Sequence, residues 1–315
     1  MDNIDLENSG TLLKKSTKIK LVNIQRLFYN VDTCLEALID LEVLKEQKSC
    51  SKCGCNMRLG PVKEEIVTRV AYRCSNYKCS ARLVVNKGCK VPLHTFCDLV
   101  FGILCRYSYF QLMARLGVST ATISAVKSSL RKIYKDLLKN RIIIGGPGQV
   151  VQVDESVICR RGKIRSPTSS DDFIRDTVWI LGIIDAQNPS NFYITRVENR
   201  TIECLTAALE GRICVGSVLH SDGHPSYPGV AENLCLSHQV VNHSIGFLSP
   251  DGIHTNNIEN VWSQLKSEMT KEHGVKRSEI DTWLDEFMYR KFMLREDDMG
   301  DFYKGFVDLL SKLLN

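Results

Sequence analysis

Residues 150–154 read Val-Val-Gln-Val-Asp, a strand-like run of mostly β-branched side chains that ends on the carboxylate of Asp154. A second strand-like run ends on Asp222, and a helix-like run begins shortly before Glu259. Acids at two strand ends and at one helix start can converge on one point of an α/β fold. A group of carboxylates of this kind can hold a pair of divalent metal ions for phosphodiester chemistry.

The neighbours of the three acids add detail to this prediction. Asp154 is followed by Glu155, and because successive strand side chains point to opposite faces, only one of the two can face a shared site. In the helix-like run, Glu259 and Lys266 lie within about 20° of each other on one flank of the apolar stripe. The alternative for Glu259 is a capping role, since Asn256, three residues earlier, loosely fits a capping box. Taken alone, each acid would be interpreted as a cap or turn residue.

Strand-like and helix-like runs alternate from residue 149 to about residue 295. A nearly continuous apolar run at 177–184 is followed by an Asn-Pro-Ser turn and a return strand at 192–197, which predicts a hairpin. The Gly-Gly-Pro-Gly stretch within residues 142–148 is interpreted as a linker, because it ends helices and strands alike. The pattern predicts an α/β domain over residues 149–295.

Cysteines gather in residues 48–92, a basic and turn-rich segment. Cys50 and Cys53 form one closely spaced pair, and after twenty further residues Cys74 and Cys79 form another. Two thiolate pairs on tight turns provide the tetrahedral sulfur cage that structural zinc prefers. So short a segment buries little apolar surface, so we expect a bound metal to supply much of its stability. The alternative interpretation is four unrelated thiols of the core.

Residues 111–124 have the spacing of a helix-turn-helix, in which Gly117 makes the turn, Ser119 caps the second helix and Ile123 packs inside. Basic side chains on the second helix are candidates for contacts with DNA phosphates or a major groove: Lys127, Arg131 and Lys132. A basic loop in the α/β segment offers three more candidates: Arg160, Arg161 and Lys163. The alternatives are an ordinary helical hairpin and a plain solvated loop.

The bulk composition permits a nucleic-acid partner without requiring one. The chain has 315 residues, a net charge of +5 and 13 cysteines. Most of the other cysteines stand singly in apolar runs, which favours a reducing compartment. No apolar run approaches the ~20 residues of a membrane helix, and the polar N-terminus argues against a secretory signal. We expect a protein that is not secreted, nuclear in a eukaryote or cytoplasmic in a bacterium.

In combination, the motifs resemble those of Merlin-type DDE transposases and their bacterial insertion-sequence relatives. The resemblance rests on Val153–Ser156, Ser221–Gly223, Val241–Ser244 and His254–Asn260. It also rests on the gap of 36 residues (223–258) before the third acid and on the basic Lys266 seven positions after it. The zinc ribbon and the helical segment resemble the family's N-terminal region. His224-Pro225 departs from the residues common after the second acid, which puts no ligand in doubt.

The resemblance implies a ribonuclease H-like catalytic core that catalyses metal-dependent DNA cleavage and strand transfer in cut-and-paste transposition. Asp154, Asp222 and Glu259 would hold two Mg²⁺ or Mn²⁺ ions, with Lys266 near a phosphate. Structural Zn²⁺ is expected at the four paired cysteines. The expected partners are DNA, as terminal inverted repeats and target DNA, and further copies of the chain, with no membrane.

The predicted organisation is an N-terminal helical segment (1–47), a zinc ribbon (48–92), a helix-turn-helix-like DNA-binding segment (93–141), the catalytic domain (149–295) and a C-terminal amphipathic helix (296–315). One rival interpretation is a host-retained, transposase-derived DNA-binding protein without transposition activity, which loss of an acid would favour. Another is a ribonuclease or Holliday-junction nuclease on the same core, against which the zinc ribbon argues.

Overall fold

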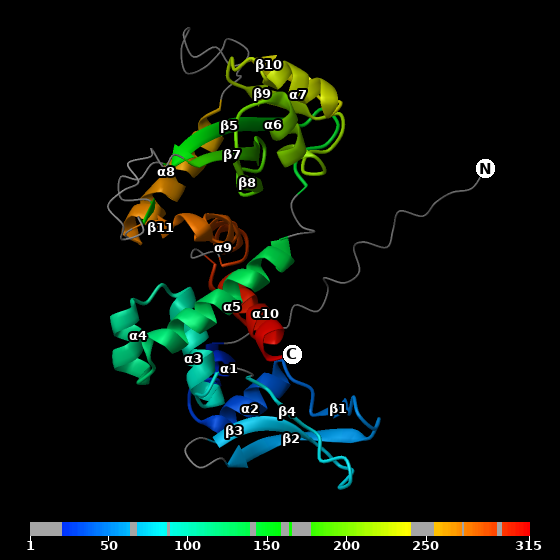
Figure 1. Ribbon diagram of the computed structural model, residues 1–315, viewed down its shortest axis with the longest axis vertical. Helices are drawn as coiled ribbons and strands as arrows, with labels where there is room; N and C mark the ends of the chain where they lie inside the picture. The colour runs from blue at the N-terminus through cyan, green and yellow to red at the C-terminus, as the bar shows by residue number, and fades with distance from the viewer. Residues whose placement is uncertain are drawn as a thin grey trace, which may run out of the picture. The chain divides into compact units, whose positions relative to one another are not determined.

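The computed structural model describes residues 21–63, 68–86, 89–138, 143–158, 164–165, 178–240, 255–272, 274–294 and 298–315. The chain forms two compact units (Figure 1). Unit 1 runs to Ser129 and also contains Met293–Asn315, whereas unit 2 is Leu130–Phe292. None of the helices described is both long and apolar enough to cross a bilayer.

Unit 1 combines helices with a small antiparallel sheet. Its strands lie in the order β1-β2-β3-β4: β1 (Gln47–Ser49), β2 (Asn56–Lys63), β3 (Thr68–Cys74) and β4 (Arg82–Val84). Its helices are α1 (Leu21–Arg26), α2 (Val31–Asp40), α3 (Leu93–Leu104), α4 (Tyr109–Leu116), the first half of α5 (Thr120–Leu138) and α10 (Met299–Leu314). The predicted N-terminal helical segment is therefore present within its described residues, as α1 and α2.

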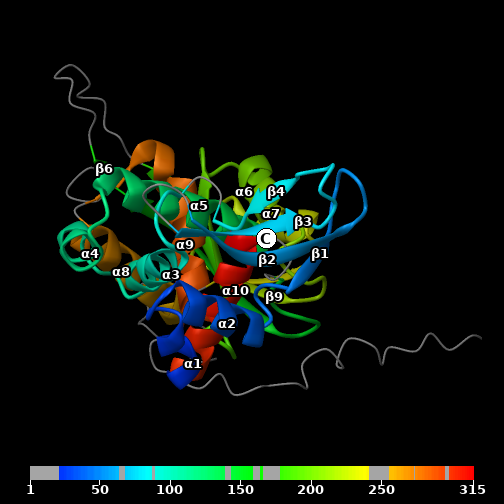
Figure 2. The ribbon, with the colours of Figure 1, turned by 90° about the horizontal axis from the view of Figure 1, so that it is seen from below.

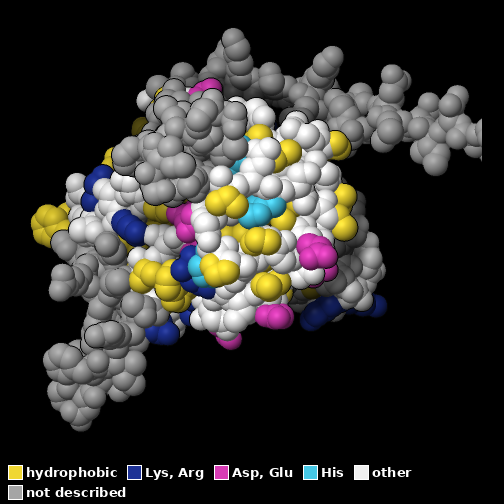
Figure 3. Space-filling view, turned by 90° about the horizontal axis from the view of Figure 1, so that it is seen from above, with side chains coloured by type: hydrophobic (Ala, Val, Ile, Leu, Met, Phe, Trp, Pro, Cys, Tyr) yellow, Lys and Arg dark blue, Asp and Glu magenta, His cyan; other side chains and the backbone are white. Residues whose placement is uncertain are grey.

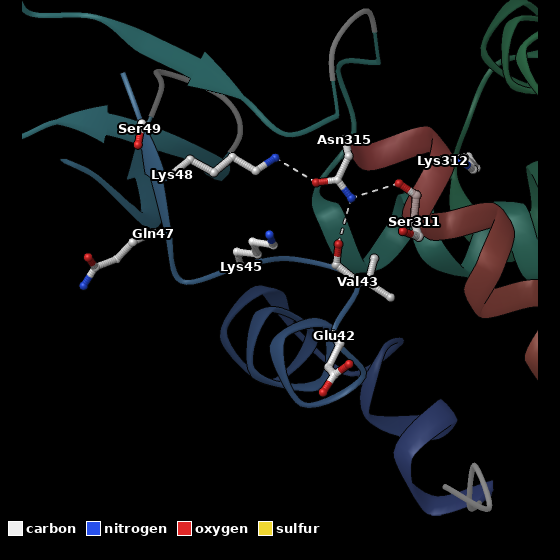
Figure 4. A pocket seen from close by; sticks show the side chains of 9 residues that line it. All are labelled: Glu42, Val43, Lys45, Gln47, Lys48, Ser49, Ser311, Lys312 and Asn315. Atoms are coloured by element: carbon white, nitrogen blue, oxygen red, sulfur yellow. Dashed lines mark hydrogen bonds between the residues drawn. The ribbon is translucent and has the colours of Figure 1, made fainter. Parts of the chain in front are cut away.

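The C-terminal helix α10 packs into the core of unit 1, beside α3 in both ribbon views (Figures 1 and 2). The ring of Phe101 on α3 meets those of Phe302 and Phe306 edge to face, with centroids 5.8 and 5.3 Å apart. At the end of α10, the Asn315 amide donates to the carbonyl of Val43 at 2.8 Å (Figure 4). A helix from the far end of the sequence thus completes this core, which aromatic contacts stabilise.

The helix-turn-helix segment has the predicted local geometry. A capping box at Ser108 begins α4, and Gly117 ends it in the left-handed conformation with φ +65°. The Ser119 hydroxyl then accepts a hydrogen bond from the Thr122 N–H at 3.2 Å, so it caps the start of α5. Ile123 is fully buried. The turn, the cap and the inward-facing residue are confirmed, whereas DNA binding by this segment stays a prediction.

Unit 2 is built on a five-stranded mixed sheet in the order β10-β9-β5-β7-β8. Its strands are β5 (Val150–Ile158), β7 (Val178–Asp185), β8 (Phe192–Val197), β9 (Val218–Ser221) and β10 (Ser237–Val240). The first three form an antiparallel meander that includes the predicted hairpin, and β9 and β10 are parallel to β5. This order and these directions define a ribonuclease H-like fold.

Helices accompany this sheet: α6 (Ile202–Leu209), α7 (Tyr227–Asn233), α8 (Asn256–Lys271) and α9 (Ile280–Met293). Beyond them, unit 2 contains the short parallel pair β6 (Ile164–Arg165) and β11 (Val275–Lys276), and a 3₁₀ turn at Arg277–Glu279. The helix α8 packs directly on β5 and β7. A Cβ at Gly182 would overlap the Trp262 ring, so this glycine permits the close approach of α8 to the sheet.

The described part of the predicted linker is packed in unit 2. Ile144 is fully buried and forms a parallel bridge with Ile213, and its N–H donates to the carbonyl of Arg212 at 2.8 Å. Gly145 has φ +83°, and a Cβ there would overlap Ser217 and Val151. The division between the two units lies inside α5 instead. A glycine-rich stretch indicates tight turns but does not distinguish a linker from a docked segment.

Candidate functional site

Asp154 and Asp222 lie level with each other on neighbouring parallel strands. The β5–β9 register pairs Gln152 with His220, and two residues further along each strand are Asp154 and Asp222. Asp222 directly follows β9, as predicted. Asp154, by contrast, does not end its strand, since β5 continues to Ile158 by pairing with β7. The expected strand end at Asp154 is therefore corrected to a position inside β5.

The carboxylate of Asp154 is partly buried and bound by α8. The indole Nε1 of Trp262 donates to its Oδ2 at 2.9 Å. Burial raises the pKa of Asp154 to about 6, against the hydrogen bond from Trp262, and the nearby charges of Glu155 and Asp222 raise it further. The carboxylates of Asp154 and Asp222, on adjacent strands, thus lie close enough for their charges to repel each other. A bound cation would offset both this repulsion and the cost of burying a charged carboxylate.

A buried glutamine fixes the start of α8 next to Asp154. The Oε1 of Gln152 accepts hydrogen bonds from the backbone N–H groups of Asn257 and Ile258, at 3.2 and 3.3 Å. Gln152 lies two residues before Asp154, so both side chains leave β5 on the same face. The sequence reasoning missed Gln152 and Trp262 as residues that order this site. The available signal was a polar residue at a buried position inside an apolar strand.

Glu259 lies in the first turn of α8, three residues before Trp262, so the two differ by about 60° around the helix. Its side chain is exposed, and its Oε1 accepts a hydrogen bond from the Thr255 hydroxyl at 3.1 Å. The N-cap of α8 is Thr255, and Asn256 is already helical, so the predicted Asn256 capping box is not formed. Lys266 lies two turns further along α8 and is partly exposed.

The three acids do not form a closed metal cage in the described structure. Among the described residues, the one group of three or more ligating side chains within 4.8 Å of one another is the cysteine cluster. Asp154 and Asp222 interact electrostatically, and Glu259 lies about one turn before Trp262 on the helix that binds Asp154. The assignment of Asp154, Asp222, Glu259 and Lys266 to catalysis stays a prediction.

The raised pKa of Asp154 has a consequence for stability. Because its ordinary pKa is 3.8 and the folded value is about 6, the fold favours the protonated acid. Its stabilising effect is complete below about pH 4 and is lost as the pH rises through 6, by roughly 1–3 kcal/mol. In buffer without Mg²⁺ or Mn²⁺, Asp154→Asn should therefore stabilise the protein at pH 7.5.

Urea unfolding of wild type and Asp154→Asn at pH 4 and pH 7.5 measures this difference. The gain is expected at pH 7.5 and should be absent at pH 4. A variant that is less stable than wild type at pH 7.5 would contradict the electrostatic account of this site.

The four paired cysteines converge in unit 1, as predicted. The Sγ atoms of Cys50 and Cys79 are 3.7 Å apart, those of Cys53 and Cys74 are 3.4 Å apart, and all four lie within 4.8 Å of one another. Each pair sits on a turn, and Gly54 has φ +72° where the first turn requires it. This convergence contradicts the alternative of four unrelated core thiols.

The chemistry of the cysteine cluster fits a tetrahedral cation. Backbone N–H groups lower the pKa of Cys50 and bring that of Cys53 to about 6, whereas desolvation raises the pKa of Cys74 to about 12. Four sulfurs this close can all be thiolates only when a cation lies between them. Cys55 is partly exposed beside this cluster, and Cys89 is buried.

The six residues predicted to contact DNA lie in different environments. Lys127 lies with its Nζ 4.8 Å from the ring centroid of Tyr109, and Lys132 is exposed. Arg131 instead forms ion pairs with Glu279 and Glu286 on the α9 side of unit 2, and 19% of its side chain is exposed. The charge of Arg131 is therefore paired with carboxylates of the protein itself. Arg160, Arg161 and Lys163 lie outside the described residues.

Side chains of both charge signs are interspersed on one side of the molecule. Figure 3 looks onto the end where β9 and β10 lie and shows Lys, Arg, Asp, Glu and His side chains among hydrophobic ones on the described surface. No single-sign field marks a DNA path on the described part of this face. The electrostatic case for DNA therefore depends on individual residues.

The sheet order and the acids on adjacent strands define unit 2 as a ribonuclease H-like domain of the kind that carries DDE chemistry. Residues 147–291 match the family model of the ISXO2-like transposase domain. Residues 147–291 thus form an insertion-sequence-related DDE transposase domain, which confirms the resemblance seen in the motifs.

Several solved structures are similar to the chain. One is a pre-cleavage Mos1 transpososome, at 13% identity and TM-score 0.31, covering 69% of this chain and 77% of that one. Another is a Mos1 mariner paired end complex with Mn, at 14% identity and TM-score 0.29, covering 69% and 76%. The HTLV-2 integrase catalytic core domain in complex with magnesium matches at 10% identity and TM-score 0.27, covering 47% and 84%. Among curated proteins, none matches the chain.

Proposed function

We propose that the chain is a DDE transposase that cuts DNA at the ends of a transposable element and joins the freed ends to target DNA, by a cut-and-paste route. The observation that carries this proposal is the pair Asp154 and Asp222, level on adjacent strands of an ISXO2-like transposase domain. The Trp262 hydrogen bond to Asp154 brings the helix that carries Glu259 to the same place.

The residues present fit a divalent cation. Asp154 is desolvated and has Asp222 and Glu155 as charged neighbours, a concentration of carboxylates that a cation would stabilise. Asp154, Asp222 and Glu259 would hold Mg²⁺ or Mn²⁺, which when bound supplies Lewis-acid activation of a water and of the phosphate. Two such ions are expected, as in other sites that transfer phosphodiesters.

The protein's own groups hold these carboxylates in place. Trp262 donates a hydrogen bond to Oδ2 of Asp154, and the backbone N–H of His224 donates to Oδ1 of Asp222 at 3.0 Å. In the proposed reaction, water attacks the phosphorus, the bond to the 3′-oxygen breaks, and the 3′-hydroxyl leaves with a proton. That hydroxyl then attacks the phosphorus of a target phosphodiester, the bond from this phosphorus to the target's own 3′-oxygen breaks, and that oxygen leaves with a proton. Lys266 would contact a phosphate as a point charge.

Unit 1 is proposed to recognise the element ends. Its cysteine cluster would hold one structural Zn²⁺, and Lys127 would contact DNA phosphates. Lys132, on the part of α5 that belongs to unit 2, would add a further phosphate contact. The partners are then terminal inverted repeats, target DNA and other copies of this chain. The loop with Arg160, Arg161 and Lys163 would hold DNA beside the acids.

A plasmid assay tests the proposal. The plasmid carries the inverted repeats that flank the coding sequence in its genome, and a control plasmid carries scrambled repeats. We expect wild-type protein with Mg²⁺ or Mn²⁺ to cut at the repeats and to join the excised segment to a second plasmid. Specific binding to the repeats without any cleavage would favour the rival, a host-retained DNA-binding protein. Cleavage of RNA or of four-way junctions alone would favour a nuclease of the same fold.

A further inference from the structure

The second acid of the Asp154-Glu155 pair is buried on the other side of β5. Successive strand side chains point to opposite faces, so Glu155 lies away from the face that binds α8. Its side chain is 1% exposed and is engaged by Arg200 through two hydrogen bonds, Nε to Oε1 at 3.0 Å and Nη2 to Oε2 at 3.3 Å. A buried carboxylate next to a metal-site candidate is thus paired with an arginine.

Arg200 is held from a second side by an aromatic ring. Its Cζ lies 5.1 Å from the ring centroid of Trp179 on β7, the range of a cation–π contact. An arginine has three nitrogens that donate, and two of them bind Glu155. The third, Nη1, has no hydrogen-bond partner among the residues that the structure describes. The Arg200 side chain is 29% exposed, which leaves room for a further ligand.

The same arginine is tied to the loop that begins at Asp222. The Ser226 hydroxyl donates to the backbone carbonyl of Arg200 at 2.6 Å, and within that loop the His224 N–H donates to Asp222. Burial lowers the pKa of Arg200, but its hydrogen bonds to Glu155, and the charges of Glu155 and Asp222, raise it above the ordinary value. The guanidinium therefore lies close enough to Asp222 for their charges to interact.

A buried hydroxyl in the same place remains unsatisfied. Tyr227 is fully buried, and its hydroxyl has no partner with the distance and angle of a hydrogen bond in the described structure. Burial raises the pKa of Tyr227, and the charges of Glu155, Asp154 and Asp222 raise it further. The cluster around Glu155 thus adjoins both candidate metal ligands.

We propose that Arg200 is a DNA-contacting residue of this site: Glu155 and Trp179 hold its guanidinium beside Asp222, so that Nη1 can donate to a phosphate oxygen of the bound strand. The inference rests on the proposed function for its substrate, DNA. A planar guanidinium already fixed on two sides loses little conformational freedom when it binds a phosphate. Glu155 is then a positioning residue, which acts through Arg200.

The competing explanation is a purely structural ion pair. A buried pair can often be replaced by neutral residues without loss of stability, whereas breaking only one side leaves an unpaired charge. The double variant Glu155→Gln/Arg200→Met removes both charges together. Arg200→Lys keeps the positive charge but cannot form the two-nitrogen contact with Glu155 and also present a third nitrogen. Arg196→Gln is the matched control, since Arg196 forms a surface ion pair with Asp281 at 3.2 Å.

The experiment uses the full chain, with thermal unfolding to verify the fold. It measures Mn²⁺-dependent nicking of supercoiled plasmid and the salt dependence of binding to an arbitrary duplex of about 30 base pairs. We expect the double variant and Arg200→Lys to fold but to nick at least about tenfold more slowly. Loss of one phosphate contact should make the log–log salt slope of the double variant shallower by about 0.9. Arg196→Gln should nick at the wild-type rate.

A folded double variant with wild-type nicking and an unchanged salt slope would overturn the proposal. If the double variant does not fold, Arg200→Lys decides by the nicking rate, because it retains the charge that Glu155 requires. If wild-type protein nicks no DNA, the proposed transposase chemistry fails instead. The salt slope of the double variant, or the duplex affinity of Arg200→Lys if the double variant is unfolded, then still shows whether Arg200 contacts phosphate.

Discussion

Asp222→Asn is expected to abolish metal-dependent strand cleavage, by about 1,000-fold or more, while leaving binding to the element ends nearly unchanged. The substitution keeps the shape of the side chain and its acceptor oxygen for the His224 N–H, which lies 3.0 Å away. It removes the negative charge that would hold a divalent cation next to Asp154. A cation at such a site stabilises the transition state by several kcal/mol, and each 1.4 kcal/mol is a factor of ten in rate.

The matched control for this prediction is Asp185→Asn. Asp185 ends β7 in the same unit, and its Oδ1 accepts hydrogen bonds from the backbone N–H groups of Gln187 and Asn188, at 2.9 and 3.1 Å. This is the role of a turn residue, which asparagine also fills. Asp185→Asn should therefore cut element ends as wild type does. Purified Asp222→Asn that cuts at the rate of this control would refute the assignment of the acid.

Local patterns were sufficient for much of unit 2. The hairpin of β7 and β8, the position of Asp222 after β9 and that of Glu259 in the first turn of α8 all follow from short-range periodicity and turn residues. The strand of Asp154 was predicted too short, because the two acids interrupt its apolar pattern. The structure shows why they are tolerated there: Trp262 binds one and Arg200 the other.

Contacts between distant segments were not predictable from these patterns. The amphipathic stripe of α10 shows that one face is buried, but not that Phe302 and Phe306 meet Phe101, some 200 positions earlier. The helical periodicity of α5 also does not show that this helix is divided between two units, with its first half in unit 1 and its second half in unit 2. The hydrogen bonds of Gln152 with α8 likewise join segments that are distant in sequence, and local patterns do not predict them. Sequence spacing identifies a buried face, and tertiary structure selects its partner.

Cys74→Ser is expected to remove the zinc ion and to unfold the four-stranded sheet of unit 1. Cys74 ends β3 opposite Met57 of β2, and its sulfur is 3.4 Å from that of Cys53. A structural zinc ion contributes on the order of 10 kcal/mol to small modules. A serine hydroxyl is a poor substitute for a thiolate ligand. We therefore expect about one zinc ion per wild-type chain and almost none in the variant.

Zinc analysis by mass spectrometry and amide hydrogen exchange test this result together. In Cys74→Ser, the amides of β2 and β3 should lose protection, while those of β5 and β7 keep it, because the core of unit 2 contains none of these cysteines. Cys204→Ser is the control, since Cys204 is a partly exposed thiol on α6 outside the cluster. Natively purified wild-type protein without zinc would contradict the prediction. So would a variant whose sheet remains protected, because the four sulfurs would then be held together by packing alone.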